Sequence, residues 1–447
     1  MGLLDFFWRL VFGDEAATSR TATASSAAGS SSSRSAAHGG ASSRAKPKQR
    51  VRRKVKLIKL RRRKIAADEK RTPLSELTVQ QLPYAFARMG VLGGYLDLCG
   101  DGDDALLERL RIPRLQTLPE LAEWLGMPLG RLAWLTHRCD DGGRPREESK
   151  AHYHFHWMKK KGGGYRLIEA PKPLLKQVQR KILLEILNRI PQHPNVHGFV
   201  LDRSIRTNAE QHAGQRVVVK LDLENFYPSV GFSRVVAIFR ALGYSREVSI
   251  WFGRLTTSAA PITLEFPEGT SKERYINFAP YRRRHLPQGA PTSPALANLS
   301  GYGLDVRLSG MAKKFKARYT RYADDLTFSG GQSFLNSLRT FLPLVRQIVR
   351  GEQFRLHEQK YKVLRDNQQQ RVTGVVVNAG ANVPRKEYDR LKAILTNSLT
   401  RGPSTQNHGA VEDFCAHLRG RISHVAFLSP RRGEKLWELF RQIDWRG

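Results

Sequence analysis

The distribution of apolar and polar positions marks where the chain is expected to fold. Residues 16–43 are dominated by Ser, Ala, Thr and Gly and contain no large apolar residue, so they lack the side chains from which a core is built. Residues 44–64 follow with thirteen Lys or Arg and no acid. We therefore expect residues 1–65 to form a disordered Ser/Ala-rich and basic tail.

Helical patterning follows, and we expect residues 66–150 to form a helical N-terminal extension. Thr117 and Glu120 have the spacing of a capping box, and apolar residues recur after them at helical intervals. The stretch 121–135 is similar to a helix-turn-helix. Two interpretations stay open: a helical pair that packs on the next domain, or the DNA-reading unit of a regulator. The DNA-reading interpretation is disfavoured because residues 132–135 are mostly apolar and offer few groups that could read bases.

Strand patterning begins with residues 152–157, where three His alternate with Tyr, Phe and Trp. The histidines then share one strand face, and a metal site is one interpretation. The favoured interpretation places the aromatic residues in the core and the histidines in water, because no acid or Cys stands beside the histidines to complete a metal site. Residues 159–171 then predict a basic hairpin that turns at three glycines, and residues 175–190 predict an amphipathic helix.

Two later stretches place acids at the ends of strands. Residues 217–221 are an apolar, β-branched run that ends at Asp222, so a carboxylate lies at the tip of a buried strand. Asp324 and Asp325 stand between β-forming residues, as at a hairpin turn, although ordinary turn chemistry also accounts for such a pair. If both elements lie in one sheet, the three carboxylates converge. All-oxygen, carboxylate-rich ligation suits magnesium or manganese.

Between these acids, residues 286–299 read Leu-Pro-Gln-Gly-Ala-Pro-Thr-Ser-Pro-Ala-Leu-Ala-Asn-Leu. Ser293 can cap a helix whose first position is taken by Pro294. In their order and spacing, this stretch and the two acidic ones resemble motifs A, B and C of reverse transcriptases. The resemblance implies an α+β right-hand polymerase with fingers, palm and thumb.

The resemblance also implies roles for single residues. Asp222, Asp324 and Asp325 are implied to be catalytic and, with the Leu223 carbonyl, to hold two magnesium ions, or manganese in their place. Arg166 and one of Lys159 or Lys160 are implied to hold the triphosphate, for which the Arg fork is well suited. Gln288 and Gly289 are further implied nucleotide contacts, and Tyr227 is implied to exclude a 2′-hydroxyl. Lys360 is a candidate proton donor to pyrophosphate, although it could equally be a solvated lysine.

Two short stretches narrow the family. Asn208-Ala-Glu-Gln-His212 precedes the first acidic strand, and Val372-Thr373-Gly374 opens a strand at residues 375–377. With the polymerase motifs, they identify the chain as similar to retron reverse transcriptases from about residue 153 onward. Members copy a dedicated structured noncoding RNA, prime from an internal guanosine 2′-hydroxyl and leave a branched RNA–DNA product. They commonly act in phage defence with an effector protein.

The C-terminal part predicts three amphipathic helices, which resemble a thumb. The resemblance divides the remaining chain into fingers and palm at residues 151–385 and thumb at residues 386–447. Polymerase motifs bind phosphates and any base, so recognition of one RNA requires other surfaces. The candidates are the two family-specific stretches and the thumb: Asn208, His212, Val372, Thr373, Gly374, Arg419 and Arg421.

Composition agrees with a nucleic-acid partner. The formal net charge is +35, which favours a polyanion such as an RNA template and its RNA–DNA product; a solvated tail is the alternative for the basic run alone. No apolar run approaches the roughly 20 residues of a membrane span, so we expect no membrane partner. Three scattered cysteines favour a reducing cytoplasm over disulfides or zinc. Three alternatives remain: another bacterial reverse transcriptase, an RNA polymerase, which Tyr227 disfavours, and a noncatalytic regulator, which the acids disfavour.

Overall fold

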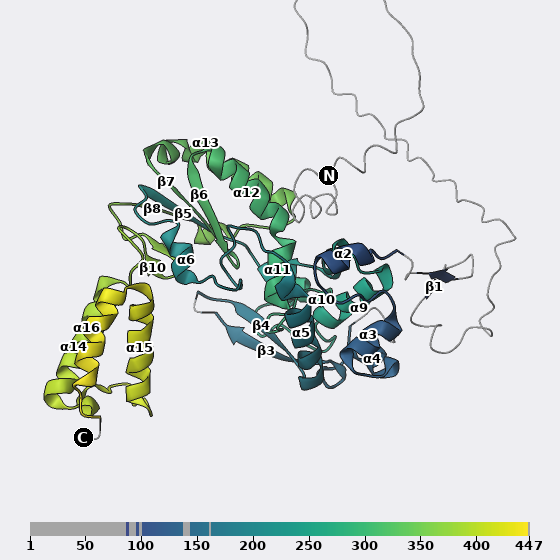
Figure 1. The fold of residues 1–447 in the computed structure, drawn as a ribbon, viewed down its shortest axis with the longest axis horizontal. Helices are drawn as coiled ribbons and strands as arrows, with labels where there is room; N and C mark the ends of the chain where they lie inside the picture. The colour runs from purple at the N-terminus through teal and green to yellow at the C-terminus, as the bar shows by residue number, and fades with distance from the viewer. Residues whose placement is uncertain (1–85, 89–94, 98–100, 137–143, 161, 446–447) are drawn as a thin grey trace, which may run out of the picture. The chain divides into compact units, whose positions relative to one another are not determined.

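The computed structural model describes residues 86–88, 95–97, 101–136, 144–160 and 162–445. The chain divides into two units, Met1–Leu96 and Asp97–Gly447. Strands β1 (Phe86–Arg88) and β2 (Tyr95–Asp97) pair with each other in a small sheet (Figure 1). The predicted tail at residues 1–65 lies outside the described residues, and everything below concerns the second unit.

The second unit starts with three short helices: α2 (Asp104–Arg109), α3 (Leu118–Leu125) and α4 (Leu129–Leu135). The predicted capping box is confirmed, since the Thr117 side chain accepts from the Glu120 N–H and Glu120 accepts in return. The Trp124 ring packs edge-on against Phe252 of α9 (Arg246–Thr256), with centroids 6.2 Å apart. This pair of helices therefore packs on the domain that follows, as the favoured interpretation predicts.

The basic hairpin is present as β3 (Tyr153–Lys159) and β4 (Tyr165–Pro171), paired from Tyr153–Pro171 to Lys159–Tyr165. His154 and His156 are exposed, as expected. His152 does not belong to that row: it is buried, precedes the strand, and is bonded to the Trp134 carbonyl at 2.8 Å. The aromatic face packs on helix α10 (Ser271–Arg282) through Trp157. The predicted sharing of one face by three histidines is therefore wrong for His152.

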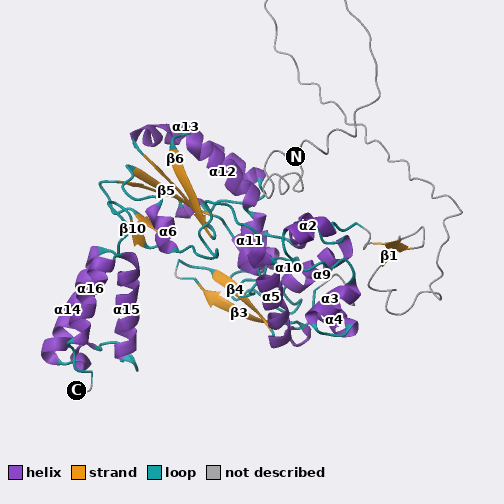
Figure 2. Cartoon of the chain, in the orientation of Figure 1, coloured by secondary structure: helices purple, strands orange, loops and turns teal. Residues whose placement is uncertain are grey.

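A four-stranded antiparallel sheet of order β6-β7-β5-β8 forms the centre of the unit (Figure 2). Its apolar core side packs on long helices, for example through Phe328 and Phe341, whose ring centroids are 5.0 Å apart. The strands are β5 (Val217–Asp222), β6 (Ala317–Tyr322), β7 (Asp325–Gly330) and β8 (Lys362–Arg365), and the two helices are α12 (Tyr302–Lys314) and α13 (Gln332–Gly351).

Helices α5 (Pro173–Glu185) and α6 (Ile205–Glu210) lie between the hairpin and β5 along the chain. Helices α7 (Phe226–Ser229), α8 (Phe232–Ala241) and α11 (Ser293–Ser300) lie between β5 and β6. The predicted start of α11 is off by one residue. Thr292, not Ser293, is the N-cap, and no side chain caps the helix. The hydroxyls of both residues are buried without a hydrogen-bond partner in the described part of the chain.

The C-terminal part holds helices α14 (Arg385–Arg401), α15 (Phe414–Leu428) and α16 (Pro430–Arg441). Their apolar stripes share one core with Val372 and Val375. The preceding strands β9 (Arg371–Val372) and β10 (Val375–Val376) form a hairpin whose turn is Thr373–Gly374, with φ values of 47° and 86°. The strand predicted at residues 375–377 is present as β10, which ends one residue earlier. The Thr373–Gly374 stretch that opens it is a tight turn, for which left-handed backbone is required.

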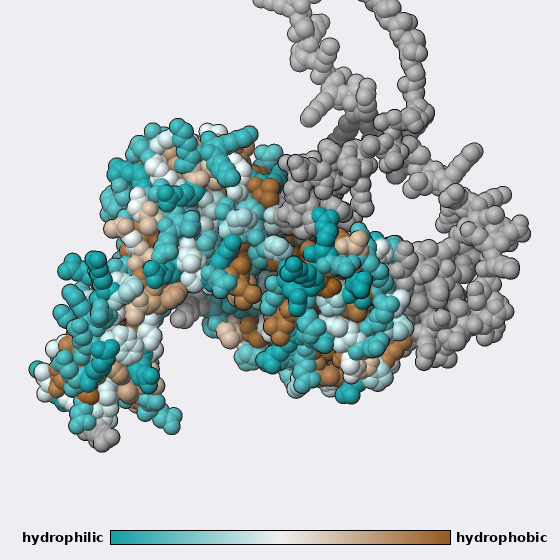
Figure 3. All heavy atoms as spheres, in the orientation of Figure 1, coloured by the Kyte–Doolittle hydropathy of each residue, from teal (hydrophilic) through white to brown (hydrophobic). Residues whose placement is uncertain are grey.

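The face of the molecule that Figure 3 shows is largely hydrophilic, with apolar residues in scattered patches. Among the helices of the described residues, none is long and apolar enough to cross a membrane.

Candidate active site

The three predicted carboxylates lie at one end of the central sheet. Asp222 is the last residue of β5 and stands opposite Asp325, the first residue of β7. Asp324 lies in the turn between β6 and β7, and its carbonyl accepts from the Leu223 N–H at 2.9 Å. Ala323 makes this tight turn with a φ of 56°. The convergence expected from the sequence is therefore present, because the hairpin β6–β7 pairs directly with β5.

Charge at this sheet end is only partly balanced. Burial raises the pKa of Asp324, and the negative charge of Asp222 raises it further. Burial also raises the pKa of Asp325, while Lys220 lowers it. The Lys360 ammonium lies 2.9 Å from Oδ1 and 3.1 Å from Oδ2 of Asp222. The carboxylate cluster thus already binds one cationic group and favours a further cation.

This chemistry fits divalent metal. Hard oxygen donors suit magnesium, and the raised pKa values of Asp324 and Asp325 reflect repulsion and burial that a bound cation would relieve. Within the described residues, no group of three or more His, Cys, Asp or Glu side chains is placed closely enough to hold an ion as it stands. A cavity of about 300 Å³ adjoins the acids, lined by Lys220, Leu221, Asp222, Asp325, Gln359, Lys360 and Lys362.

Several implied nucleotide contacts surround the acids. Burial and then the charge of Arg166 lower the pKa of Lys160, while Asp222 raises it, so these groups share one electrostatic environment. Burial and then the charge of Asp324 raise the pKa of Tyr227 to about 12. The structure therefore brings Lys160, Arg166 and Tyr227 to the carboxylates, although they come from the hairpin and from the helix after β5.

The loop at residues 286–290 is held against the hairpin. The Glu169 N–H donates to the Gln288 carbonyl at 2.9 Å. Gly289 has a φ of 133°, and a Cβ there would lie 3.0 Å from the Glu169 carbonyl oxygen. Only glycine fits this combination of backbone angle and close approach, so the loop lies flat on β4.

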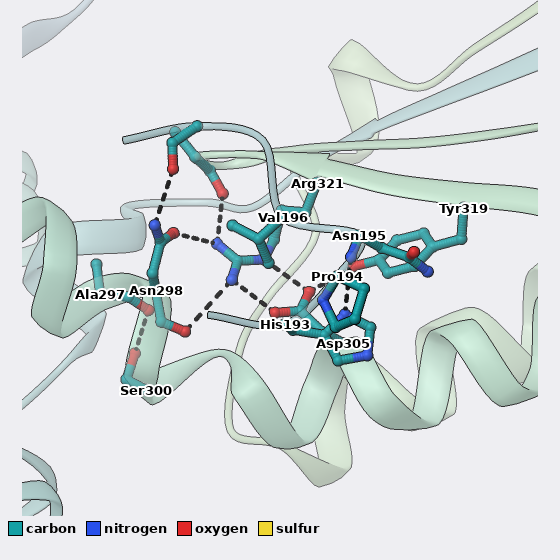
Figure 4. Close-up of polar contacts among 12 residues, drawn as sticks. His193, Pro194, Asn195, Val196, Ala297, Asn298, Ser300, Asp305, Tyr319 and Arg321 are labelled. Carbon is teal, nitrogen blue, oxygen red and sulfur yellow. Dashed lines mark hydrogen bonds and ion pairs between the residues drawn. The ribbon is translucent and has the colours of Figure 1, made fainter. Parts of the chain in front are cut away.

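A buried ionic network behind the turn was missed by the sequence analysis (Figure 4). The fully buried Arg321 guanidinium donates to Asp305 Oδ2 at 2.6 Å, to Asn298 Oδ1 at 3.0 Å and to the Ala323 carbonyl at 3.1 Å. Tyr319 donates to Asp305 Oδ1 at 2.8 Å. The available signal was the period of two along β6, which puts Arg321 on the same strand face as Tyr319, where a charge needs a buried partner.

The proposed RNA-recognition residues divide by exposure. Asn208, His212 and Val372 are buried, so their side chains offer no direct contact to RNA. His212 is bonded to Ser329 Oγ and Thr320 Oγ1, each at 2.7 Å. The expectation of direct recognition is corrected for these three: Val372 belongs to an apolar core, and both ring nitrogens of His212 have hydroxyl partners inside the protein.

The two family-specific stretches nevertheless contact each other. Asn208 Nδ2 donates to Thr373 Oγ1 at 3.4 Å, which connects helix α6 to the β9–β10 turn. Arg419 is exposed on α15, and Arg421 is partly buried on the same helix. The remaining surface candidates are thus the turn and this thumb-like helix.

Comparison with known proteins agrees with this geometry. The family model described as reverse transcriptase (RNA-dependent DNA polymerase) matches residues 158–377. The retron Mx65 reverse transcriptase of Myxococcus xanthus is 39% identical over 334 residues, which are 75% of this chain and 73% of the relative. The retron Mx162 reverse transcriptase of the same organism is 36% identical over 74% of this chain and 68% of its own.

A more distant relative, the retron Ec86 reverse transcriptase of Escherichia coli, is 28% identical over 76% of this chain and 92% of its own. A solved telomerase from Candida albicans, in complex with the TWJ fragment of telomeric RNA, aligns with 9% identity over 64% of this chain and 56% of that one. Its TM-score is 0.36, a value too low to bear on the fold. The sequence matches show that the chain belongs to the retron reverse transcriptase family and is an RNA-directed DNA polymerase.

Proposed function

We propose that this enzyme copies a dedicated, structured noncoding RNA into single-stranded DNA that stays joined to RNA. Priming from an internal guanosine 2′-hydroxyl and a role in phage defence with an effector protein follow from the family. The observation that carries the catalytic part is the placement of Asp222 opposite Asp325 with Asp324 in the adjoining turn. Three carboxylates at one sheet end would supply the oxygen donors that phosphoryl transfer with two metal ions uses.

Each part of the unit takes a role in this proposal. Residues 151–385 form the fingers and palm, with β3–β4 as the fingers hairpin and the central sheet as the palm. Residues 386–447 form the thumb, supported by a continuous core in α14–α16. Residues 66–150 form the N-terminal extension, which holds strands β1 and β2 beside the predicted helices and whose helix α3 packs on α9 through Trp124.

The site residues divide the chemistry among them. Asp222, Asp324, Asp325 and the Leu223 carbonyl would hold two magnesium ions, which when bound activate the primer hydroxyl and neutralise the triphosphate. Lys160 and Arg166 orient the triphosphate from the fingers, where their positive charge faces the acids. Lys360 lies close enough to Asp222 to deliver a proton to the leaving pyrophosphate.

The choice of nucleotide is assigned to uncharged contacts, and the choice of RNA to a separate surface. Gln288 and Gly289 present a backbone surface to the template and the incoming nucleotide, because the flat loop leaves room for close approach. Tyr227 closes the sugar side of the site against a 2′-hydroxyl and so selects deoxynucleoside triphosphates. The exposed side of the Thr373–Gly374 turn and Arg419 contact the noncoding RNA, and the buried Asn208 sets the position of that turn through its bond to Thr373.

The nucleic acid that copurifies with the enzyme tests this proposal. The protein is purified after expression with its native flanking DNA, and bound nucleic acid is treated separately with RNase and DNase. Single-stranded DNA that shortens in gels after RNase treatment is the expected result. Unlinked complementary DNA would favour a different class of reverse transcriptase, and duplex DNA alone would favour a binding regulator.

A further inference from the structure

A second cavity lies next to the active site and has no role in the chemistry assigned so far. Its volume is about 580 Å³, against about 300 Å³ for the cavity that adjoins the acids. The charged residues that line it are three arginines and two glutamates: Arg346, Arg350, Arg355, Glu224 and Glu358. We call it the arginine cavity.

The end of helix α13 forms one wall of the arginine cavity. The Gln353 N–H donates to the Arg350 carbonyl at 3.0 Å, and Gln353 has a φ of 63°. The Phe354 N–H donates to the Val349 carbonyl, also at 3.0 Å. These two bonds define a Schellman ending, which reverses the chain directly after the helix. Arg355 therefore returns towards Arg350, which lies in the last turn of α13.

The returning chain pairs with the end of β5 that carries the first acid. The Glu224 N–H donates to the Arg355 carbonyl at 2.8 Å. The His357 N–H donates to the Asp222 carbonyl at the same distance, and the residues between these bonds form an antiparallel bridge. Residues that are diagonal across such a pair lie about 7–8 Å apart. The Arg355 side chain therefore starts about that far from Asp222.

A single short turn separates the arginine cavity from the cavity beside the acids. The turn is the 3₁₀ helix Glu358–Lys360. Glu358 lines the arginine cavity, whereas Gln359 and Lys360 line the other one. The Lys360 ammonium lies 2.9 Å from Asp222. The arginine cavity is thus the immediate neighbour of the site at which the triphosphate is proposed to react.

Two of the three arginines are available to a ligand. Arg346 donates to both carboxylate oxygens of Glu358, at 3.0 and 2.9 Å, so these two charges neutralise each other. Among the described residues, neither Arg350 nor Arg355 has an ion pair or a side-chain hydrogen bond, and both are exposed. The helix dipole favours a positive charge at Arg350, but Arg355 lies beyond the helix. The dipole therefore does not explain why the two converge.

An oligophosphate is the ligand that suits this lining. A guanidinium group can bind two phosphate oxygens at once. Burial lowers the pKa of Lys160, whereas Asp222 and Glu224 raise it, so the lysine that is proposed to hold the triphosphate lies near both acids. Glu224 also lines the arginine cavity. The phosphates held by Lys160 are therefore close to the entrance of this cavity.

We propose that the arginine cavity receives the pyrophosphate that each nucleotide addition releases, a step that deepens, and rests on, the polymerase function proposed above. The primer oxygen forms a bond to the α-phosphorus, and the bond from that phosphorus to the β-phosphate oxygen breaks. Pyrophosphate leaves with the electron pair of the broken bond. Arg350 and Arg355 then bind its phosphate groups and free the acids for the next nucleotide. Product release of this kind limits the rate of many enzymes.

A nucleic-acid strand is the less suitable occupant. It carries one phosphate charge per nucleotide and requires a basic groove that follows the strand. The arginine cavity instead places two unpaired arginines beside two acids, at the end of the site where the leaving group forms. The incoming triphosphate is also less suitable, because its α-phosphate must stay at the acids.

Inhibition by inorganic pyrophosphate tests the proposal. Processive extension of oligo(dT) on poly(rA) is measured with magnesium over a range of dTTP and pyrophosphate concentrations. Pyrophosphate at the acids competes with the nucleotide and raises its KM, whereas pyrophosphate in the arginine cavity blocks release and lowers kcat. We expect both effects in the natural enzyme. The double variant Arg350→Gln/Arg355→Gln should keep the effect on KM and require roughly tenfold or more pyrophosphate for the effect on kcat.

A matched variant controls for the loss of charge. Arg339 is exposed on the same helix and does not line the arginine cavity, so Arg339→Gln should keep both effects. An unchanged effect on kcat in the double variant, or an equal loss in Arg339→Gln, overturns the proposal. It is also overturned if the double variant changes only the KM for dTTP, which indicates the incoming triphosphate, or only the affinity for primer–template, which indicates a nucleic-acid strand.

Calorimetry measures binding independently of extension. Inorganic pyrophosphate and magnesium are titrated into the enzyme without nucleic acid, and the double variant should bind roughly tenfold or more weakly at an unchanged unfolding temperature. Equal binding by the two proteins contradicts the proposed cavity. A natural enzyme that binds pyrophosphate through these arginines but extends no primer contradicts the proposed function instead.

Discussion

The Lys360 ammonium contacts both carboxylate oxygens of Asp222, at 2.9 and 3.1 Å. Lys360 lies on the short 3₁₀ helix Glu358–Lys360, 138 residues from its partner. The sequence left open whether this lysine is a proton donor or a solvated side chain. Its contact with Asp222 shows that the side chain is ion-paired and not simply solvated, and the donor role stays a prediction.

Lys360→Gln should slow nucleotide incorporation by about 100-fold or more, the usual contribution of a positioned general acid. Glutamine is one bond shorter and still donates hydrogen bonds, but its amide is not an acid at neutral pH, so the binding of primer–template should persist while proton transfer is lost. Single-turnover incorporation rates measure the effect. Lys362→Gln, which lines the same cavity, is the matched control, and an equal loss in both variants would assign the effect to charge alone.

Tyr227→Ala should admit ribonucleotides. The proposed selection is steric, and truncation removes the ring that closes the sugar side of the site. Tyr227→Phe keeps that ring and should keep the selectivity. The ratio of kcat/KM for a matched deoxynucleotide and ribonucleotide on one template decides the matter, and the same ratio in all three proteins would place the gate elsewhere.

Arg321→Met should destabilise the fold by about 3–5 kcal/mol, because it leaves the fully buried Asp305 carboxylate without its partner. The double variant Arg321→Met/Asp305→Leu removes both charges and should be more stable than Arg321→Met. Urea unfolding measures both free energies. If the two substitutions instead destabilise additively, the charges act independently and the ion pair does not organise this region.

Acid should destabilise the protein through its buried histidines. Burial lowers the pKa of His212 to about 3 and that of His197 to about 4, both below the value of about 6.5 for an unfolded chain. The unfolded state then binds protons that the folded state excludes, so the stability is complete above about pH 6.5. It is lost as the pH falls towards 4, by up to about 1.4 kcal/mol per pH unit for each histidine.

Replacement of one of these histidines isolates its share of the pH dependence. His212→Gln lowers stability at pH 7 but should reduce the slope of unfolding free energy between pH 6.5 and 4.5. Urea unfolding at several pH values gives both slopes. Parallel slopes in the two proteins would mean that His212 is not the group that titrates.

The sequence predicted the acids well because their signal is local. Asp222 ends an apolar strand, and Asp324 lies at the turn of a β-hairpin. Each pattern places a carboxylate at the end of a sheet, and the pairing of the two elements brings the carboxylates together. The hairpin at residues 159–171 was also predicted correctly, because its glycines fix the turn and the register of the two strands follows from the turn.

Residues whose partners are distant in the sequence were harder to interpret. Arg321 meets Asp305 on a helix that precedes its strand, and His212 meets hydroxyls on β6 and β7; no periodicity shows such contacts. His212 was consequently taken for a surface residue. The turn before β10 was not predicted, because a positive φ at a β-branched residue such as Thr373 is rare.

Primer extension by Asp324→Asn tests the central claim most directly. Asparagine preserves volume but removes one charge from the cluster that would hold the metal ions, which supply most of the rate. With magnesium and a primer annealed to an RNA template, we predict no extension above background, together with natural unfolding temperature and RNA affinity. Asp366→Asn, an acid beyond the end of β8 that pairs with Arg216, should extend normally. Near-natural extension by Asp324→Asn would contradict the assignment of this sheet end as the catalytic centre.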